Sequence, residues 1–136
     1  MADNYQRENV PAYVAAFHHQ MEEGYSASDF VIARSGAASL SEFAAFALPG
    51  ILIPFPYAAD DHQTRNAEIF VRAGAAILVK ESEISGDVFA RHINDLITDT
   101  QKLRRMSESS AQLAPNNAAE IVAATMEKYS AHDKGA

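Results

Sequence analysis

The chain has 136 residues, the length of one domain, because domains usually contain roughly 100–200 residues. Its net charge of −7 argues against nucleic acid as a partner, since phosphate backbones are bound mainly by Lys and Arg. The absence of cysteine excludes disulfides, thiolate metal ligands and cysteine nucleophiles. No apolar run approaches the roughly 18 residues that span a bilayer, and the first residues lack a signal-peptide pattern. We therefore expect a soluble cytoplasmic protein.

Along the chain, apolar runs alternate with helical patterns, which is typical of βα units around a parallel sheet. A first strand is expected at 11–17 and a helix at 19–28. The apolar, β-branched run at 29–33 predicts a buried parallel strand. The next helix is predicted by four apolar residues that share one helical stripe: Leu40, Phe43, Ala44 and Ala47.

Proline and glycine mark the boundaries of the next elements. Pro49-Gly50 ends the helix, a strand follows at 51–54, and 55–61 is a polar loop. A helix then begins at His62, with Asp60 or Asp61 as its N-cap. It stops at Gly74, and the remaining elements are a strand at 75–79, a helix from Ser85 or Gly86 to Leu96 or Ile97, and helices at 101–113 and 118–129.

Four strands, each followed by a helix, predict an α/β fold with a Rossmann-like parallel sheet. Four strands are few for such a sheet, since sheets average about five or six strands. We therefore expect a partial domain that lacks an amino-terminal half.

Ligands of open α/β sheets bind beyond the carboxyl ends of the strands, where three loops are expected here. The first carries His18 and His19, which suggest a catalytic or metal site or, more simply, a solvated or packed pair. In the second loop, at 34–39, small residues around Gly36 allow a ligand to approach the backbone, and the following helix N-terminus favours phosphate. The alternative is an ordinary helix start, with Ser39 and Glu42 as a capping box.

The third loop brings Asp60, Asp61, His62 and Gln63 together at a helix start. Such carboxylate and amide groups suit recognition of hydroxyls, as on a sugar. The alternative is a solvated loop whose aspartate caps the helix. A metal site is disfavoured, since consecutive residues do not all face one ion without a special turn, and no metal is expected.

Residues 27–42 and 48–67 closely resemble the carboxy-terminal domain of the MurG family, and the resemblance extends over about 11–129. This family contains the bacterial peptidoglycan N-acetylglucosaminyltransferases of GT-B fold. The resemblance implies a partial donor domain over 1–129, with 130–136 as a flexible tail. It also implies transfer of GlcNAc from UDP-GlcNAc to lipid I, which makes lipid II at the cytoplasmic face of the membrane. No cofactor is implied.

The resemblance also implies roles for ten residues. Glu42 accepts hydrogen bonds from the ribose hydroxyls, and the helix start presents its backbone to the diphosphate. The sugar hydroxyls of GlcNAc are held at the third loop, and the uracil is contacted by backbone at the first. In chain order, these residues are His18, Met21, Gly36, Ala37, Ala38, Ser39, Glu42, His62, Gln63 and Asn66, the last of which braces the sugar-binding helix.

Two departures from the family pattern affect what we expect. His18-His19 stands where the family usually has an acidic pair, so a side-chain role there does not follow. The acceptor domain and its candidate general base are absent, so we expect inverting transfer by the whole enzyme and no activity from this chain alone. The alternative function is a nucleotide-sugar-binding module of a split glycosyltransferase that needs a partner chain. A truncated sheet also predicts self-association through its exposed edge.

Overall fold

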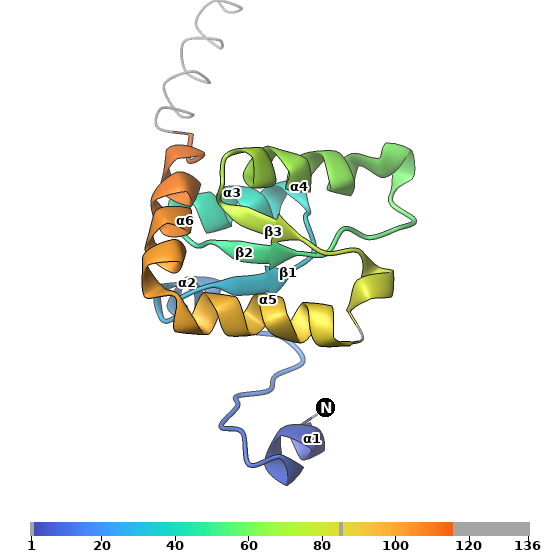
Figure 1. The fold of residues 1–136 in the computed structure, drawn as a ribbon, viewed down its shortest axis with the longest axis vertical. Helices are drawn as coiled ribbons and strands as arrows, with labels where there is room; N and C mark the ends of the chain where they lie inside the picture. The colour runs from blue at the N-terminus through green and yellow to red at the C-terminus, as the bar shows by residue number, and fades with distance from the viewer. Residues whose placement is uncertain (1, 85, 116–136) are drawn as a thin grey trace, which may run out of the picture.

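A computed structural model describes residues 2–84 and 86–115 of the chain. Its centre is a parallel sheet of three strands in the order β1 (Val31–Ala33), β2 (Gly50–Leu52), β3 (Ala76–Leu78) (Figure 1). Val31, Gly50 and Ala76 are in register, so the three strands end at the same edge of the sheet. The α/β fold with a parallel sheet is confirmed, with shorter strands than the sequence predicted.

The helices include all those predicted for the described residues, and one helix at the amino end was not predicted. The helices are α1 (Ala2–Arg7), α2 (Met21–Ser26), α3 (Ala37–Ala45), α4 (His62–Arg72), α5 (Asp87–Thr98) and α6 (Thr100–Gln112), with short 3-10 helices η1 (Ala59–Asp61) and η2 (Glu81–Glu83). α2 is shorter than expected, while α4, α5 and α6 match their predicted bounds within about two residues. The predicted helix at 118–129 and the tail lie outside the described residues.

The core has two halves because side chains alternate between the faces of a strand. On one face, Leu52 packs with buried residues of α3 and α4, among them Phe43 and Phe70. On the other face, Ile51 packs against Leu96 of α5 and its neighbours. Helices thus cover both faces, as the continuous apolar character of these strands requires.

The strand predicted at 11–17 does not form, and this expectation was wrong. Tyr13 is 83% exposed and Phe17 is 73% exposed. A strand is stable only where a neighbouring strand pairs with its backbone, and no backbone hydrogen bond of the described residues joins 11–17 to the sheet. Together with α1, this segment lies apart from the sheet and its helices (Figure 1). The described sheet therefore has three strands rather than four.

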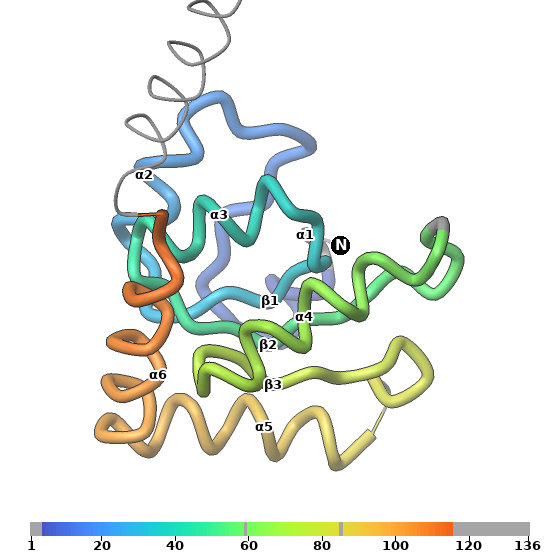
Figure 2. Tube along the Cα trace, turned by 90° about the horizontal axis from the view of Figure 1, so that it is seen from above, coloured from blue at the N-terminus to red at the C-terminus, as the bar shows by residue number. Residues whose placement is uncertain are grey.

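α6 closes the end of the sheet at which the strands begin (Figure 2). The buried hydroxyl of Ser110 donates to the carbonyl of Leu48 at 2.8 Å, and Ser107 donates to the carbonyl of Ala47 at 2.7 Å. These carbonyls lie just before β2, so the two serines satisfy backbone groups that α6 would otherwise bury. The opposite end of the sheet, where the strands finish, is left to loops and to the starts of α3 and α4.

Two predicted helix caps differ from the structure. The N-cap of α3 is Gly36, in extended conformation, so Ser39 lies inside the helix and the capping box with Glu42 is wrong. Asp61 is the N-cap of α4, as one of two predicted candidates, but its side chain caps no backbone N–H. Instead its carboxylate accepts a 2.6 Å hydrogen bond from the Thr64 hydroxyl, because its left-handed backbone turns the side chain away from the usual capping position.

Candidate functional site

The loop after β1 is tied to the start of α4 by two hydrogen bonds. The Ser35 hydroxyl, which is fully buried, donates to the Gln63 carbonyl at 2.8 Å. The Asn66 amide donates in the other direction, to the Ser35 carbonyl, at 3.2 Å. The starts of α3 and α4 are therefore held side by side at the carboxyl end of the sheet, and the Asn66 amide is one of the groups that join them.

The loop after β2 is fixed to the same point. The Gln63 side-chain oxygen accepts a hydrogen bond from the Phe55 N–H at 2.9 Å, so its amide NH₂ is the group left to donate to a ligand. Arg34 donates to the carbonyls of Ile53 and Pro54 at 3.3 and 3.2 Å. Its guanidinium also pairs with the Glu81 carboxylate at 2.7 Å and lies 5.5 Å from the centre of the Phe55 ring. Arg34 thus connects the three loops that follow β1, β2 and β3 at the carboxyl end of the sheet.

The start of α3 is open for the approach of a ligand. A Cβ built on Gly36 meets nothing within 4 Å, and the side chains of Ala37 and Ala38 are exposed. The first N–H groups of a helix have no partner within it and carry the positive end of its dipole. The start of α3 is therefore suited to an anion such as a phosphate.

Glu42 lies on α3 three residues beyond Ser39, where its carboxylate meets a tyrosine of α2. The Tyr25 hydroxyl donates to Glu42 at 2.8 Å. Burial and the neighbouring Glu42 carboxylate raise the pKa of Tyr25 to about 12. Tyr25 also borders a shallow hollow of about 470 Å³ beside β1, together with Met21 and Ser39. Three residues predicted for the nucleotide, Met21, Ser39 and Glu42, are thus gathered around one tyrosine.

The structure says less about the roles of the two histidines among the predicted site residues. The half-buried His18 packs edge-on against Tyr13, with ring centres 6.1 Å apart, so its ring is a packing group of the amino-terminal segment. His62 is the exposed first residue of α4, directly before Gln63.

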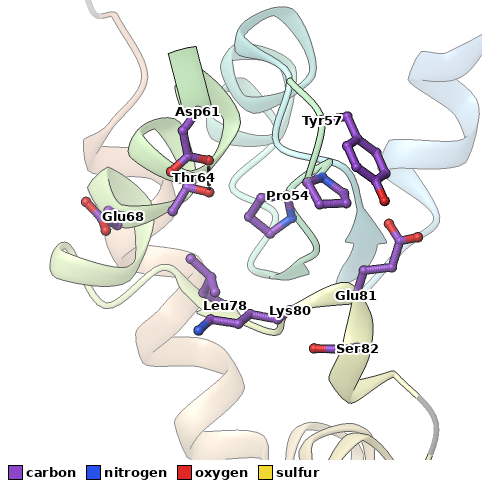
Figure 3. Close-up of a pocket in the computed structure, with 10 residues that line it drawn as sticks. Pro54, Tyr57, Asp61, Thr64, Glu68, Leu78, Lys80, Glu81 and Ser82 are labelled. Atoms are coloured by element: carbon purple, nitrogen blue, oxygen red, sulfur yellow. Dashed lines mark hydrogen bonds between the residues drawn. The ribbon is translucent and has the colours of Figure 1, made fainter. Parts of the chain in front are cut away.

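A larger hollow of about 900 Å³ lies on the other side of α4, between that helix and η2 (Figure 3). One wall is lined by Asp61, the N-cap of α4, and by Thr64 and Glu68 of α4, and the opposite wall by Lys80 and Glu81. None of the ten predicted residues borders it, because successive residues of a helix point about 100° apart. We locate the candidate site at the starts of α3 and α4, where the predicted groups converge, rather than in this hollow.

Neither a metal centre nor a membrane span is found within the described ranges 2–84 and 86–115. No group of three or more His, Asp or Glu residues there is arranged to hold a metal ion. No helix in those ranges is both long enough and apolar enough to cross a bilayer.

The arrangement of βα units has a counterpart among known proteins. A family model described as the glycosyltransferase family 28 C-terminal domain matches residues 1–127. The chain belongs to this family. The crystal structure of Acinetobacter baumannii MurG matches this family 28 domain with a TM-score of 0.82 at 30% identity, over 93% of this chain and 38% of that one.

Curated relatives agree with this assignment. The UDP-N-acetylglucosamine–N-acetylmuramyl-(pentapeptide) pyrophosphoryl-undecaprenol N-acetylglucosamine transferase of Methylococcus capsulatus is 45% identical over 121 residues, which are 89% of this chain and 34% of the relative. The Geobacter metallireducens enzyme of the same name is 40% identical over 118 residues, 87% of this chain and 32% of the relative. The predicted MurG resemblance is confirmed, and the family 28 domain spans about a third of the length of these relatives.

Two contacts of this family 28 domain were missed by the sequence analysis. Tyr25 lies in the helix predicted at 19–28 and was given no role, and nothing in the sequence links it to Glu42, 17 residues away. The bond from the Phe55 N–H to Gln63 was also not expected, since it depends on how the loop after β2 folds back. The hydroxyl of Tyr25, on the same side of the helix as Met21 four residues before it, was the one available signal.

Proposed function

We propose that this chain is the UDP-GlcNAc-binding portion of an inverting N-acetylglucosaminyltransferase that makes lipid II in peptidoglycan synthesis. The proposal rests chiefly on one arrangement. The free start of α3 and the Gln63 amide are fixed at the carboxyl end of one sheet by the bonds between Ser35, Gln63 and Asn66, and the Glu42 carboxylate lies further along α3. The names of the relatives supply the donor and the lipid-linked acceptor.

Each part of a nucleotide sugar has a matching group along this surface. The diphosphate accepts hydrogen bonds from the N–H groups of Ala37, Ala38 and Ser39, and the dipole of α3 stabilises its negative charge. Glu42 lies about 9 Å along the helix axis from Gly36 and accepts the ribose hydroxyls. Beyond the diphosphate, His62 and Gln63 hold the GlcNAc hydroxyls, while the uracil lies toward His18 and Met21.

In transfer, an acceptor hydroxyl attacks the anomeric carbon of GlcNAc, and the bond to the diphosphate oxygen breaks. Negative charge then grows on the departing UDP, where the fixed N–H groups at the start of α3 stabilise it. The described residues supply donor binding and leaving-group stabilisation. Removal of the acceptor proton falls to a base in the remaining two-thirds of the enzyme, so the chain is inactive alone. The whole enzyme works at the inner face of the cell membrane, where its lipid-linked acceptor resides.

Titration of the ¹⁵N-labelled chain with UDP tests the donor site directly. We expect backbone amide shifts at Ser39, Glu42 and Gln63, and none in α6. Shifts absent at all three positions with millimolar UDP would remove the proposal. Activity is tested by mixing the chain with a separately produced acceptor domain of a relative, because restored transfer favours a subunit of a split enzyme and no restoration favours a piece of a single chain.

A further inference from the structure

Tyr25 is held in place by two side chains of α3 and by that of its C-cap, Phe46. Its ring packs edge-on against Phe43, with centres 5.6 Å apart, and at a tilt against Phe46, with centres 5.5 Å apart. Its hydroxyl donates to Oε2 of the Glu42 carboxylate at 2.8 Å. The ring is partly buried while Glu42 is exposed, so the buried partner is the one that fixes the exposed one.

This contact restricts a side chain that is otherwise mobile. An exposed glutamate has three rotatable side-chain bonds, and fixing them on ligand binding costs conformational entropy. A carboxylate accepts about four hydrogen bonds, of which Tyr25 takes one. The remaining positions suffice for two neighbouring hydroxyls. Because the pKa of Tyr25 is raised to about 12, its hydroxyl remains a donor at every physiological pH.

We propose that Tyr25 is a positioning residue, which holds the Glu42 carboxylate in the orientation that accepts the paired hydroxyls of a ribose. The inference rests on the proposed function, since it assigns to Tyr25 a part in recognising the nucleotide. It goes beyond the proposed function, because selection for a ribonucleotide then depends on a residue of α2 that itself contacts no nucleotide. Tyr25 thereby couples α2 to the donor site on α3.

The test compares UDP with 2′,3′-dideoxy-UDP by calorimetric titration of the whole chain. The unsubstituted chain is expected to prefer UDP. Tyr25→Phe keeps the ring and removes the hydroxyl, and it should lower the affinity for UDP by roughly three- to tenfold, as for one lost hydrogen bond. Its affinity for the dideoxy nucleotide should not change, which also shows that the variant is folded. Tyr5→Phe, in α1 and away from the sheet, is the matched control.

A second variant separates positioning from packing. In a chain that already carries Glu42→Gln, the further change Tyr25→Phe should have little effect on UDP. A loss of affinity for both nucleotides, or an equal loss in the Glu42→Gln background, would show a packing role and overturn the inference. The inference is also overturned if Tyr25→Phe prefers UDP over the dideoxy nucleotide as strongly as the unsubstituted chain does. If the unsubstituted chain binds both nucleotides equally, the ribose role of Glu42 fails first, and the proposal for Tyr25 fails with it.

Discussion

Ser35 and Gln63 are joined by a hydrogen bond of 2.8 Å across the starts of two helices that follow different strands. Ser35 is fully buried there, and its own carbonyl is bonded in turn by Asn66. Reciprocal bonds of this kind fix the spacing between α3 and α4 more firmly than apolar packing alone, because each has a defined length and direction. The distance between the diphosphate and sugar portions of the proposed site depends on this junction.

Ser35→Ala is expected to destabilise the chain by about 1 kcal/mol, the net value of a typical buried hydrogen bond. Urea unfolding followed by circular dichroism measures the change. Ser41→Ala is the matched control, because its hydroxyl bonds only the carbonyl one turn back on an exposed helix face. Equal stabilities for the two variants would mean that the junction contributes little to the fold.

Substitution by alanine should affect stability at one glycine and ligand binding at another. A Cβ on Gly50 would lie 2.9 Å from Val31 Cγ2 and 3.1 Å from the Val31 carbonyl, so Gly50→Ala should cost about 1–3 kcal/mol of stability through overpacking. The Cβ of Gly36→Ala meets no neighbour, and the loss of a better N-cap is offset by the smaller conformational freedom of the unfolded chain, so the stability should change by less than about 0.5 kcal/mol. The substitution should instead lower the affinity for UDP roughly tenfold, because the new methyl group occupies space that the ligand needs. A stable Gly36→Ala chain with unchanged UDP affinity would contradict the proposed diphosphate position.

Glu42→Ala should weaken UDP binding by about 1–3 kcal/mol, as expected for loss of a charged hydrogen-bonding partner. The fold should be unaffected, since Glu42 is exposed and the one hydrogen bond of its side chain within the described residues is with the Tyr25 hydroxyl. Calorimetric titration gives the affinity, and thermal unfolding checks the stability. An unchanged affinity would reject the ribose role.

The tyrosine–glutamate contact also predicts a stability change at alkaline pH. The pKa of Tyr25 is raised to about 12 by burial first and by Glu42 second, against about 10 in the unfolded chain. Between these values the folded chain binds more protons than the unfolded chain, so stability is full below about pH 10 and falls as pH rises toward 12. Urea unfolding across that pH range should show a steeper fall for the unsubstituted chain than for Tyr25→Phe. Parallel curves would contradict the raised pKa.

The free edge of β1 predicts self-association. β1 pairs only with β2 within the described ranges, and Ile32 at its centre is 45% exposed. Such an edge is a template for a strand of a second copy, and a charged residue on it opposes pairing. Sedimentation at high concentration should therefore detect dimers of the unsubstituted chain and monomers of Ile32→Lys. Monomers of both would show that the edge is protected.

The elements near the centre of the fold were predictable because their information is local. The β-branched run before Arg34, the periodic apolar residues of α3 and the Gly74 stop each determine an element through the chain's own sterics and periodicity. The two short loops that carry Gly36 and Gln63 follow from the same pattern, since parallel strands end at one edge. The resemblance to the MurG family came from these same stretches.

What the amino-acid sequence determined alone was the order of strands and helices and the small residues at the helix starts, which depend on neighbours a few positions apart. Only the tertiary structure decided that 11–17 stays outside the sheet, since its Tyr13 and Phe17 have no neighbouring strand to pack and pair with. It also decided that Tyr25 bonds Glu42 and that Ser35 bonds Gln63. Those contacts join residues 17 and 28 positions apart, and they form only after the sheet has brought the helices together.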